Sequence, residues 1–169
     1  HIPWKVPVTD GRSARERITA ENKICSTVFT GQDACAVCCI LDSAGKRTSS
    51  FYIKGGREYA NASRQIYERI HRSEQVHGGG GNAKANYRYW KKLRNLHEHY
   101  AHQFSCQIID YCKEQNASIL VLPEYNRDHG NIIQASVGKN SPLRLVTSIR
   151  EKLKYKAWQE GIVVLEVQQ

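Results

Sequence analysis

The chain has 169 residues, which is enough for one domain with a substantial hydrophobic core. Its 25 lysines and arginines outnumber 16 acidic residues, and the formal charge of +9 favours a polyanionic partner such as nucleic acid. No apolar run reaches transmembrane length and no signal-peptide pattern opens the chain, which argues against a membrane protein and for a cytoplasmic one. Because the chain starts at His1 and contains no methionine, we expect it to be a segment of a longer polypeptide.

We predict one domain that is preceded by an N-terminal connecting segment. Residues 1–22 are polar and charged after Ile2-Pro3-Trp4, and we interpret them as a connection from an upstream domain. Residues 23–169 form the domain itself, into which a helical hairpin is inserted at about residues 57–115.

The domain opens with three predicted strands that form an antiparallel meander. The first alternates small and β-branched side chains, the second is a nearly unbroken apolar run that we expect to be buried on both faces, and the third alternates polar and apolar residues. Two turns that contain glycine and aspartate join them. The strands are residues 24–29, 34–41 and 47–53.

Two helices follow, at residues 58–76 and 83–115, with four consecutive glycines between them. Because this glycine run joins two helices, it is a hinge and not the phosphate loop of a strand-to-helix junction. The second helix carries apolar residues at three- and four-residue steps, and this periodicity predicts one core-facing stripe. The stripe comprises Tyr87, Trp90, Leu93, His97, Tyr100, Phe104, Ile108 and Tyr111.

The C-terminal third predicts a strand, a helix and a second strand. The strand at residues 118–123 is apolar, and residues 125–141 are polar, rich in glycine and asparagine, and predicted to be mobile. Ser141-Pro142 supplies a helix cap and a first-turn proline, and the helix stops at Gly161. A buried strand at residues 162–167 completes a right-handed parallel crossover unit.

Two clusters resemble metal ligands: Cys35, Cys38 and Cys39 in the second strand, and His97, His99 and His102 in the long helix. A strand points neighbouring thiols to opposite faces, whereas a metal knuckle needs a tight turn, so we interpret the cysteines as reduced core residues. The histidines lack the i, i+4 spacing of a zinc-binding helix, and a solvated or stacking face explains them better. No metal site is therefore expected.

Basic residues concentrate where acids are scarce, above all in the first half of the long helix. A concentrated positive charge on a helix favours contacts with nucleic-acid phosphates. The candidate nucleic-acid-binding residues are Lys54, Arg57, Arg64, Lys84, Arg88, Lys91, Lys92, Arg94, Arg144 and Arg150.

The order of meander, long basic helix, VLPE strand, charged helix and IVVLEV strand resembles the RuvC-like domain, of RNase H-like α/β fold, in TnpB nucleases and type V CRISPR effectors. The resemblance covers about residues 23–169 and rests on the order of elements more than on any single motif. In that family an aspartate on the first strand and a glutamate after a strand like SILVLP bind the catalytic metals. It implies that Glu124 stands at the second position, and that a third carboxylate lies beyond a zinc ribbon, outside this segment.

Two registers fit the first motif. Asp33 follows Gly31 in a Gly-x-Asp pattern, but the second strand would then begin at once, without room for a turn. The register that preserves both strand lengths and the turn places Phe29 where the aspartate should be. Phenylalanine cannot bind a metal, and one remaining carboxylate holds Mg²⁺ weakly.

The resemblance therefore implies a RuvC-like pseudonuclease, most similar to the type V-K effectors of CRISPR-associated transposons. Its implied partners are guide RNA, target DNA and transposition regulator proteins in the bacterial cytoplasm, without a cofactor. Glu124 departs from the degraded site expected there. The alternative is an active RNA-guided DNA endonuclease that uses Asp33 and Glu124, a third carboxylate elsewhere, and Mg²⁺.

Overall fold

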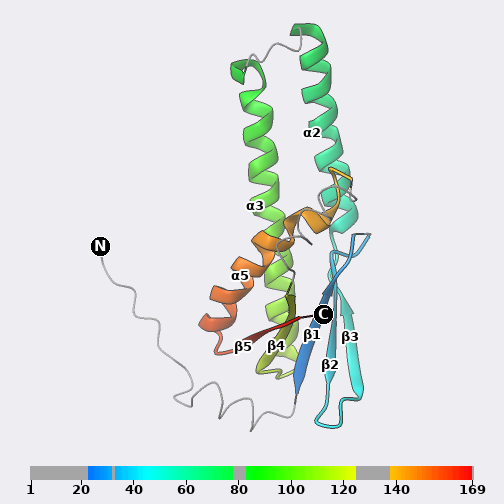
Figure 1. The fold of residues 1–169 in the computed structure, drawn as a ribbon, viewed down its shortest axis with the longest axis vertical. Helices are drawn as coiled ribbons and strands as arrows, with labels where there is room; N and C mark the ends of the chain where they lie inside the picture. Colours follow the sequence, from blue (N-terminus) through cyan, green and yellow to red (C-terminus); the bar gives the residue numbers. More distant parts are fainter. Residues whose placement is uncertain (1–22, 32, 78–82, 125–137, 169) are drawn as a thin grey trace, which may run out of the picture.

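The computed structural model describes residues 23–31, 33–77, 83–124 and 138–168. They build a single sheet with helices on one side and a helical hairpin that extends away from it (Figure 1). The elements in chain order are β1 (Ile24–Phe29), β2 (Ala36–Leu41), β3 (Arg47–Tyr52), α2 (Gly56–His77), α3 (Ala83–Glu114), β4 (Ile119–Glu124), η1 (Pro142–Leu145), α5 (Val146–Gln159) and β5 (Val163–Gln168).

The sheet has the order β3-β2-β1-β4-β5, so the first strand in sequence lies at its centre. β1 pairs antiparallel with β2, and β2 with β3, which confirms the predicted meander. β4 pairs parallel with β1 on its other edge, and β5 pairs parallel with β4. This mixed sheet, antiparallel on one side of β1 and parallel on the other, confirms the predicted α/β architecture.

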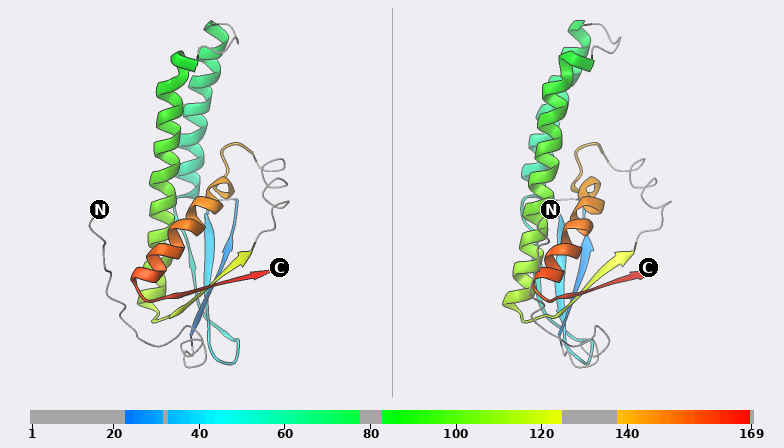
Figure 2. Two further views of the ribbon diagram at one scale, coloured as in Figure 1. Left: turned by 60° about the vertical axis from the view of Figure 1, so that its left-hand side comes forward. Right: turned by 90° about the vertical axis from the view of Figure 1, so that its left-hand side faces the viewer.

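The helices cover one face of the sheet. Along β1 the side chains of Cys25, Thr27 and Phe29 are buried, while those between them are half-buried or exposed. Figure 2 shows α3 and α5 side by side over the buried face. The hydrophobic core therefore lies between these two helices and the central strands, and includes Phe104 and Leu120 among its fully buried members.

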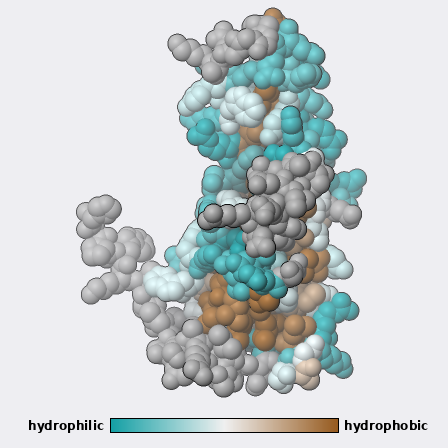
Figure 3. Space-filling model, viewed as in Figure 1, coloured by the Kyte–Doolittle hydropathy of each residue, from teal (hydrophilic) through white to brown (hydrophobic). Residues whose placement is uncertain are grey.

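The hairpin of α2 and α3 projects well beyond the sheet (Figures 1 and 2). Its two helices contact each other through aromatic rings: Tyr59 packs against His97 and Tyr100, and Tyr67 meets Trp90 edge-on at 6.1 Å between ring centroids. Figure 3 shows that the described surface of the hairpin is mostly hydrophilic, whereas apolar residues gather over the sheet. Among the described residues, the outer half of each hairpin helix packs mainly against the other helix of the hairpin.

Two strand predictions were wrong in part. The second strand begins at Ala36, two residues later than expected, and only its helix-facing side chains, such as Cys38 and Ile40, are fully buried. The expectation of burial on both faces fails because α3 and α5 cover one face only. β5 is half-buried to exposed along its length because it is the edge strand, so the predicted buried strand is also corrected.

The entry into α5 begins as predicted at Ser141-Pro142, although its first turn is a 3₁₀ helix. The Ser141 hydroxyl oxygen accepts a hydrogen bond from the backbone N–H of Leu143 at 3.3 Å, and the proline occupies a position where no helical N–H is needed. The helix ends before Gly161, whose φ of 72° is a left-handed conformation that glycine adopts without strain.

The cysteines of the second strand behave as core residues. Cys38 is fully buried and Cys39 is half-buried on the opposite face, as strand alternation requires. Burial raises the pKa of Cys35 to about 12, so this thiol stays protonated at physiological pH. Among the described residues all cysteines are free.

The predicted glycine hinge and most of the predicted mobile stretch, residues 78–82 and 125–137, lie outside the described residues. No helix in the described part of the chain is both long and apolar enough to cross a membrane.

Candidate functional site

The C-terminal end of β1 is the position where the family resemblance places a catalytic aspartate. Phe29, the last residue of this strand, is 6% exposed and belongs to the hydrophobic core. It stands opposite Ala36 of β2, and Leu145 of η1 lies in the same core cluster. The side chain at this position therefore points under the helices, into an apolar interior that would strongly disfavour an unpaired carboxylate.

Glu124 lies at the same end of the neighbouring strand. The parallel register pairs Ser26 of β1 with Val121 of β4, and three residues further along each strand come Phe29 and Glu124. Glu124 is exposed, in contrast to Phe29. Phe29 and Glu124 thus end two neighbouring strands, three residues beyond the last β1–β4 pair, and the favoured register predicts that Phe29 stands at the aspartate position.

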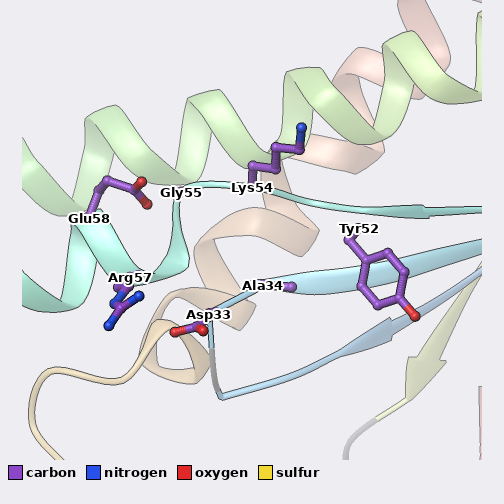
Figure 4. Close-up of a pocket in the computed structure, with 7 residues that line it drawn as sticks. All are labelled: Asp33, Ala34, Tyr52, Lys54, Gly55, Arg57 and Glu58. Carbon is purple, nitrogen blue, oxygen red and sulfur yellow. The ribbon is translucent and has the colours of Figure 1, made fainter.

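Asp33, the first metal ligand in the alternative, lies on the β2 side of β1, whereas Glu124 lies on the β4 side. Asp33 is exposed in the turn that joins β1 to β2, and it borders an open cavity of about 420 Å³. In Figure 4 its carboxylate lies beside Arg57, the second residue of α2. The cavity lining comes from this turn, the end of β3 and the start of α2: Asp33, Ala34, Tyr52, Lys54, Gly55, Arg57 and Glu58.

Glu124 is not among the residues that line this cavity, because β4 flanks β1 on the edge opposite to β2 and β3. Asp33 and Glu124 are thus directed to different sides of the central strand. Within the described residues, no group of three or more His, Cys, Asp or Glu side chains is placed to hold a metal ion. The alternative, in which Asp33 and Glu124 bind Mg²⁺ together with a third carboxylate elsewhere, stays a prediction.

The segment before α5 closes over the end of β1. The Ser141 hydroxyl donates to the carbonyl oxygen of Gly31 at 3.5 Å, and the hydroxyl of Ser63 in α2 donates to the Asn140 side chain at 3.3 Å. A Cβ atom at Gly31 would lie 2.9 Å from Leu143, so only glycine fits this approach without a shift. These contacts fix the apolar cover beside Phe29.

The first half of α3 carries the predicted basic surface. At about 100° per residue, Arg88, Lys91, Lys92 and Arg94 point away from the buried side of the helix, which is marked by Leu93. All four are exposed, and among the described residues no ion pair or side-chain hydrogen bond engages them. Lys84 lies on the same helix, but its side chain is outside the described ones. The arrangement presents cations to solvent along about two helical turns.

The predicted core stripe of α3 is correct from Leu93 onward but not for its first two members. Phe104, Ile108 and Tyr111 are buried against the sheet, whereas Tyr87 is 59% exposed and Trp90 44% exposed. The periodicity was read correctly, but nothing in the described fold covers the outer half of the hairpin except α2. These two exposed aromatic residues were missed as candidate functional residues, and their position among basic residues was the available signal.

The other predicted basic contacts lie in different surroundings. Lys54 and Arg57 border the cavity, and Arg64 donates to the Asn61 side chain at 3.0 Å. The Arg150 guanidinium forms an ion pair with Glu166 of β5 at 2.5 Å. Arg144 is exposed in η1.

Other cations of α5 are also engaged inside the fold. Lys152 pairs with Glu98 of α3 at 2.7 Å, and this hydrogen bond lowers the pKa of the Glu98 carboxyl. Burial would raise the pKa of Glu166, but hydrogen bonds from Lys154 and Arg150 hold it below its ordinary value. The charges of α5 therefore tie it to its neighbours, whereas those of the outer α3 face solvent.

Comparison with known proteins supports the fold. The chain is similar to part of a protein in a cryo-EM structure of the Cas12f1–sgRNA–target DNA complex, with 14% identity over 87% of this chain and a TM-score of 0.58. It is also similar to part of a CRISPR–Cas12f ternary complex, with 17% identity over 87% of this chain and a TM-score of 0.59. The fold is thus the RNase H-like fold found in Cas12f.

The chain spans 35% and 28% of the lengths of those two proteins. No family model and no curated protein matches the sequence.

Proposed function

We propose that this chain is the inactive RuvC-like part of an RNA-guided type V effector, which binds guide RNA and target DNA without cutting. The observation that carries the proposal is the burial of Phe29 in the core at the end of β1, because the proposed alignment puts this residue where a nuclease site needs a carboxylate. Two-metal hydrolysis requires several carboxylates around two ions, and Glu124 alone cannot hold them.

The charge of the chain supports the binding half of the proposal. The exposed cations of outer α3 face solvent without partners among the described residues, so their charge is available to phosphates. The structural similarity to Cas12f, seen in complex with sgRNA and target DNA, agrees with such a role. Backbone contacts of this kind position a guide–target duplex without reading its sequence.

Retained binding without cleavage fits the type V-K effectors of CRISPR-associated transposons, so we propose transposition regulator proteins as further partners. Such proteins would be recruited to the DNA that the guide selects. Recruitment is tested by mixing the guide-loaded protein with such regulators on matched and unmatched DNA. The proposal expects retention on matched DNA only.

The binding surface is tested by titrating salt during binding of a labelled RNA–DNA duplex. Each lost phosphate contact flattens the plot of log affinity against log salt by about one unit, so Lys91→Ala/Lys92→Ala should lower the slope by about two. The matched control is Lys46→Ala/Arg47→Ala, which removes the same charge from the exposed turn between β2 and β3. An unchanged slope and affinity in the α3 variant would show that these lysines only solvate the helix.

A further inference from the structure

The outer part of α3 exposes aromatic rings in the middle of its basic surface. Tyr87 is 59% exposed and Trp90 is 44% exposed, whereas Phe104 and Tyr111 of the same helix are buried. Exposed tyrosine and tryptophan side chains on a soluble surface mark interaction sites more often than single exposed aliphatic residues do.

Helical spacing gathers these rings with two cations into one patch. Trp90 lies three residues after Tyr87, and Lys91 and Arg94 each lie four residues after one of the rings. The Trp90 indole rests edge-on against Tyr67 of α2 at an interplanar angle of 82°, which holds it in place. We define Tyr87, Trp90, Lys91 and Arg94 as the aromatic–cationic patch.

Along α3 itself, the charge near the patch has one sign. From residue 83 to residue 97 the sequence contains no aspartate or glutamate, and the next acid, Glu98, is paired with Lys152. A surface with cations and without acids is complementary to phosphates. Its positive charge would repel basic peptides. A flat acidic protein surface would pair with the cations but would offer no group that stacks on the aromatic rings.

Double-stranded and unpaired nucleotides would contact such a patch through different groups. In a duplex the bases stack on one another, so only the cations would find partners. An unpaired nucleotide offers its base for stacking on an aromatic ring as well as its phosphate, and folded RNA holds such nucleotides in loops at fixed positions. A rigid helical patch that combines both kinds of side chain fits a fixed loop.

We propose that the aromatic–cationic patch binds unpaired nucleotides in a loop of the RNA partner, with a base stacked on Tyr87 and the flanking phosphates on Lys91 and Arg94. This inference rests on the proposed function, because it assigns one part of the RNA to one part of the basic surface. It extends that function from phosphate contacts to recognition of an RNA loop.

The test compares a fluorescein-labelled RNA hairpin that carries an unpaired loop with a blunt RNA duplex of equal length. Tyr87→Ala should weaken hairpin binding about ten-fold, since base stacking on an aromatic ring contributes on this order, and should leave duplex binding and the salt slope unchanged. Tyr87→Phe should bind like the parent, because phenylalanine retains the ring. Tyr155→Ala, which removes an exposed tyrosine of α5, is the matched control and should change neither.

The outcomes separate the two proposals. If the parent binds neither RNA in a salt-dependent manner, the proposed function itself fails. If the parent binds both and Tyr87→Ala weakens neither, or weakens both equally, the loop inference is wrong while the proposed function stands. An equal loss on a DNA hairpin with the same loop sequence would overturn the assignment to RNA.

Discussion

Phe29→Asp introduces the carboxylate that the proposed alignment expects in an active nuclease, and we expect this change to unfold the protein rather than to create a metal site. The ring is 6% exposed in the core. Loss of a buried phenylalanine costs about 3–5 kcal/mol, and an unpaired buried carboxylate adds roughly 1–3 kcal/mol or more even when it takes up a proton. The sum of about 4–8 kcal/mol is comparable with the total stability of a typical domain, about 5–15 kcal/mol.

Urea unfolding followed by circular dichroism measures this effect. The matched control is Val28→Asp, one residue earlier on the opposite face of β1, where the side chain is 49% exposed. It introduces the same carboxylate but should cost only about 1 kcal/mol, in the range of strand propensity. Equal losses for the two variants, or a stable Phe29→Asp protein that binds Mg²⁺ at this position, would refute the assignment of Phe29 to the core.

Three further predictions concern stability and charge. Gly31→Ala should destabilise the protein by about 1–3 kcal/mol in urea unfolding because its Cβ would lie 2.9 Å from a leucine side chain of η1, whereas Gly138→Ala, with open space around it, should be nearly neutral. Burial, followed by a nearby arginine charge, lowers the pKa of His97 below 6.5, so the unfolded chain binds more protons and the free energy of unfolding should fall as pH drops from about 7 to about 5. His97→Phe should reduce this fall, and an identical pH profile in that variant would contradict the assignment. Arg150→Ala should cost roughly 1 kcal/mol of stability through its partly exposed ion pair with Glu166, while the salt slope of nucleic-acid binding stays unchanged; a slope lower by about one would show a phosphate contact instead.

The fold could be predicted from the sequence because its signals are local. Alternation in residues 24–29, turn residues after each early strand, and Ser141-Pro142 at the entry to the last helix all specify local structure, and the structure follows them closely. The order of these elements then restricts the sheet to few topologies. What the sequence could not supply was the coverage of each face.

Errors arose where burial depends on distant parts of the chain. The apolar run in β2 resembles a strand buried on both faces, but its exposed side has no helix over it. Likewise Tyr87 and Trp90 share the helical period of Phe104, yet they are exposed, and the hairpin to which they belong projects beyond the sheet (Figure 1). Periodicity tells which residues share a face, and only the tertiary arrangement tells what that face meets.

The sequence predicted where in the fold the candidate site lies, but not how its residues are arranged relative to one another. Residue counting predicts that Phe29 stands at the family's aspartate position, and the structure shows that β1, which ends at Phe29, pairs in parallel with β4, which ends at Glu124. The separation of Asp33 from Glu124 by the central strand could not be read from the sequence, because it depends on β4 crossing to the far edge of β1. The engagement of Arg150 with β5 was equally hidden, since sixteen residues separate it from Glu166.

The central claim is that the protein retains target DNA without cutting it. The most direct measurement is to incubate the guide-loaded protein with end-labelled, guide-matched DNA and Mg²⁺ or Mn²⁺, and to follow bound and cleaved DNA in the same sample. The account predicts guide-dependent retention of DNA that stays intact. Guide-dependent cleavage that is abolished by Asp33→Ala or Glu124→Ala would contradict it.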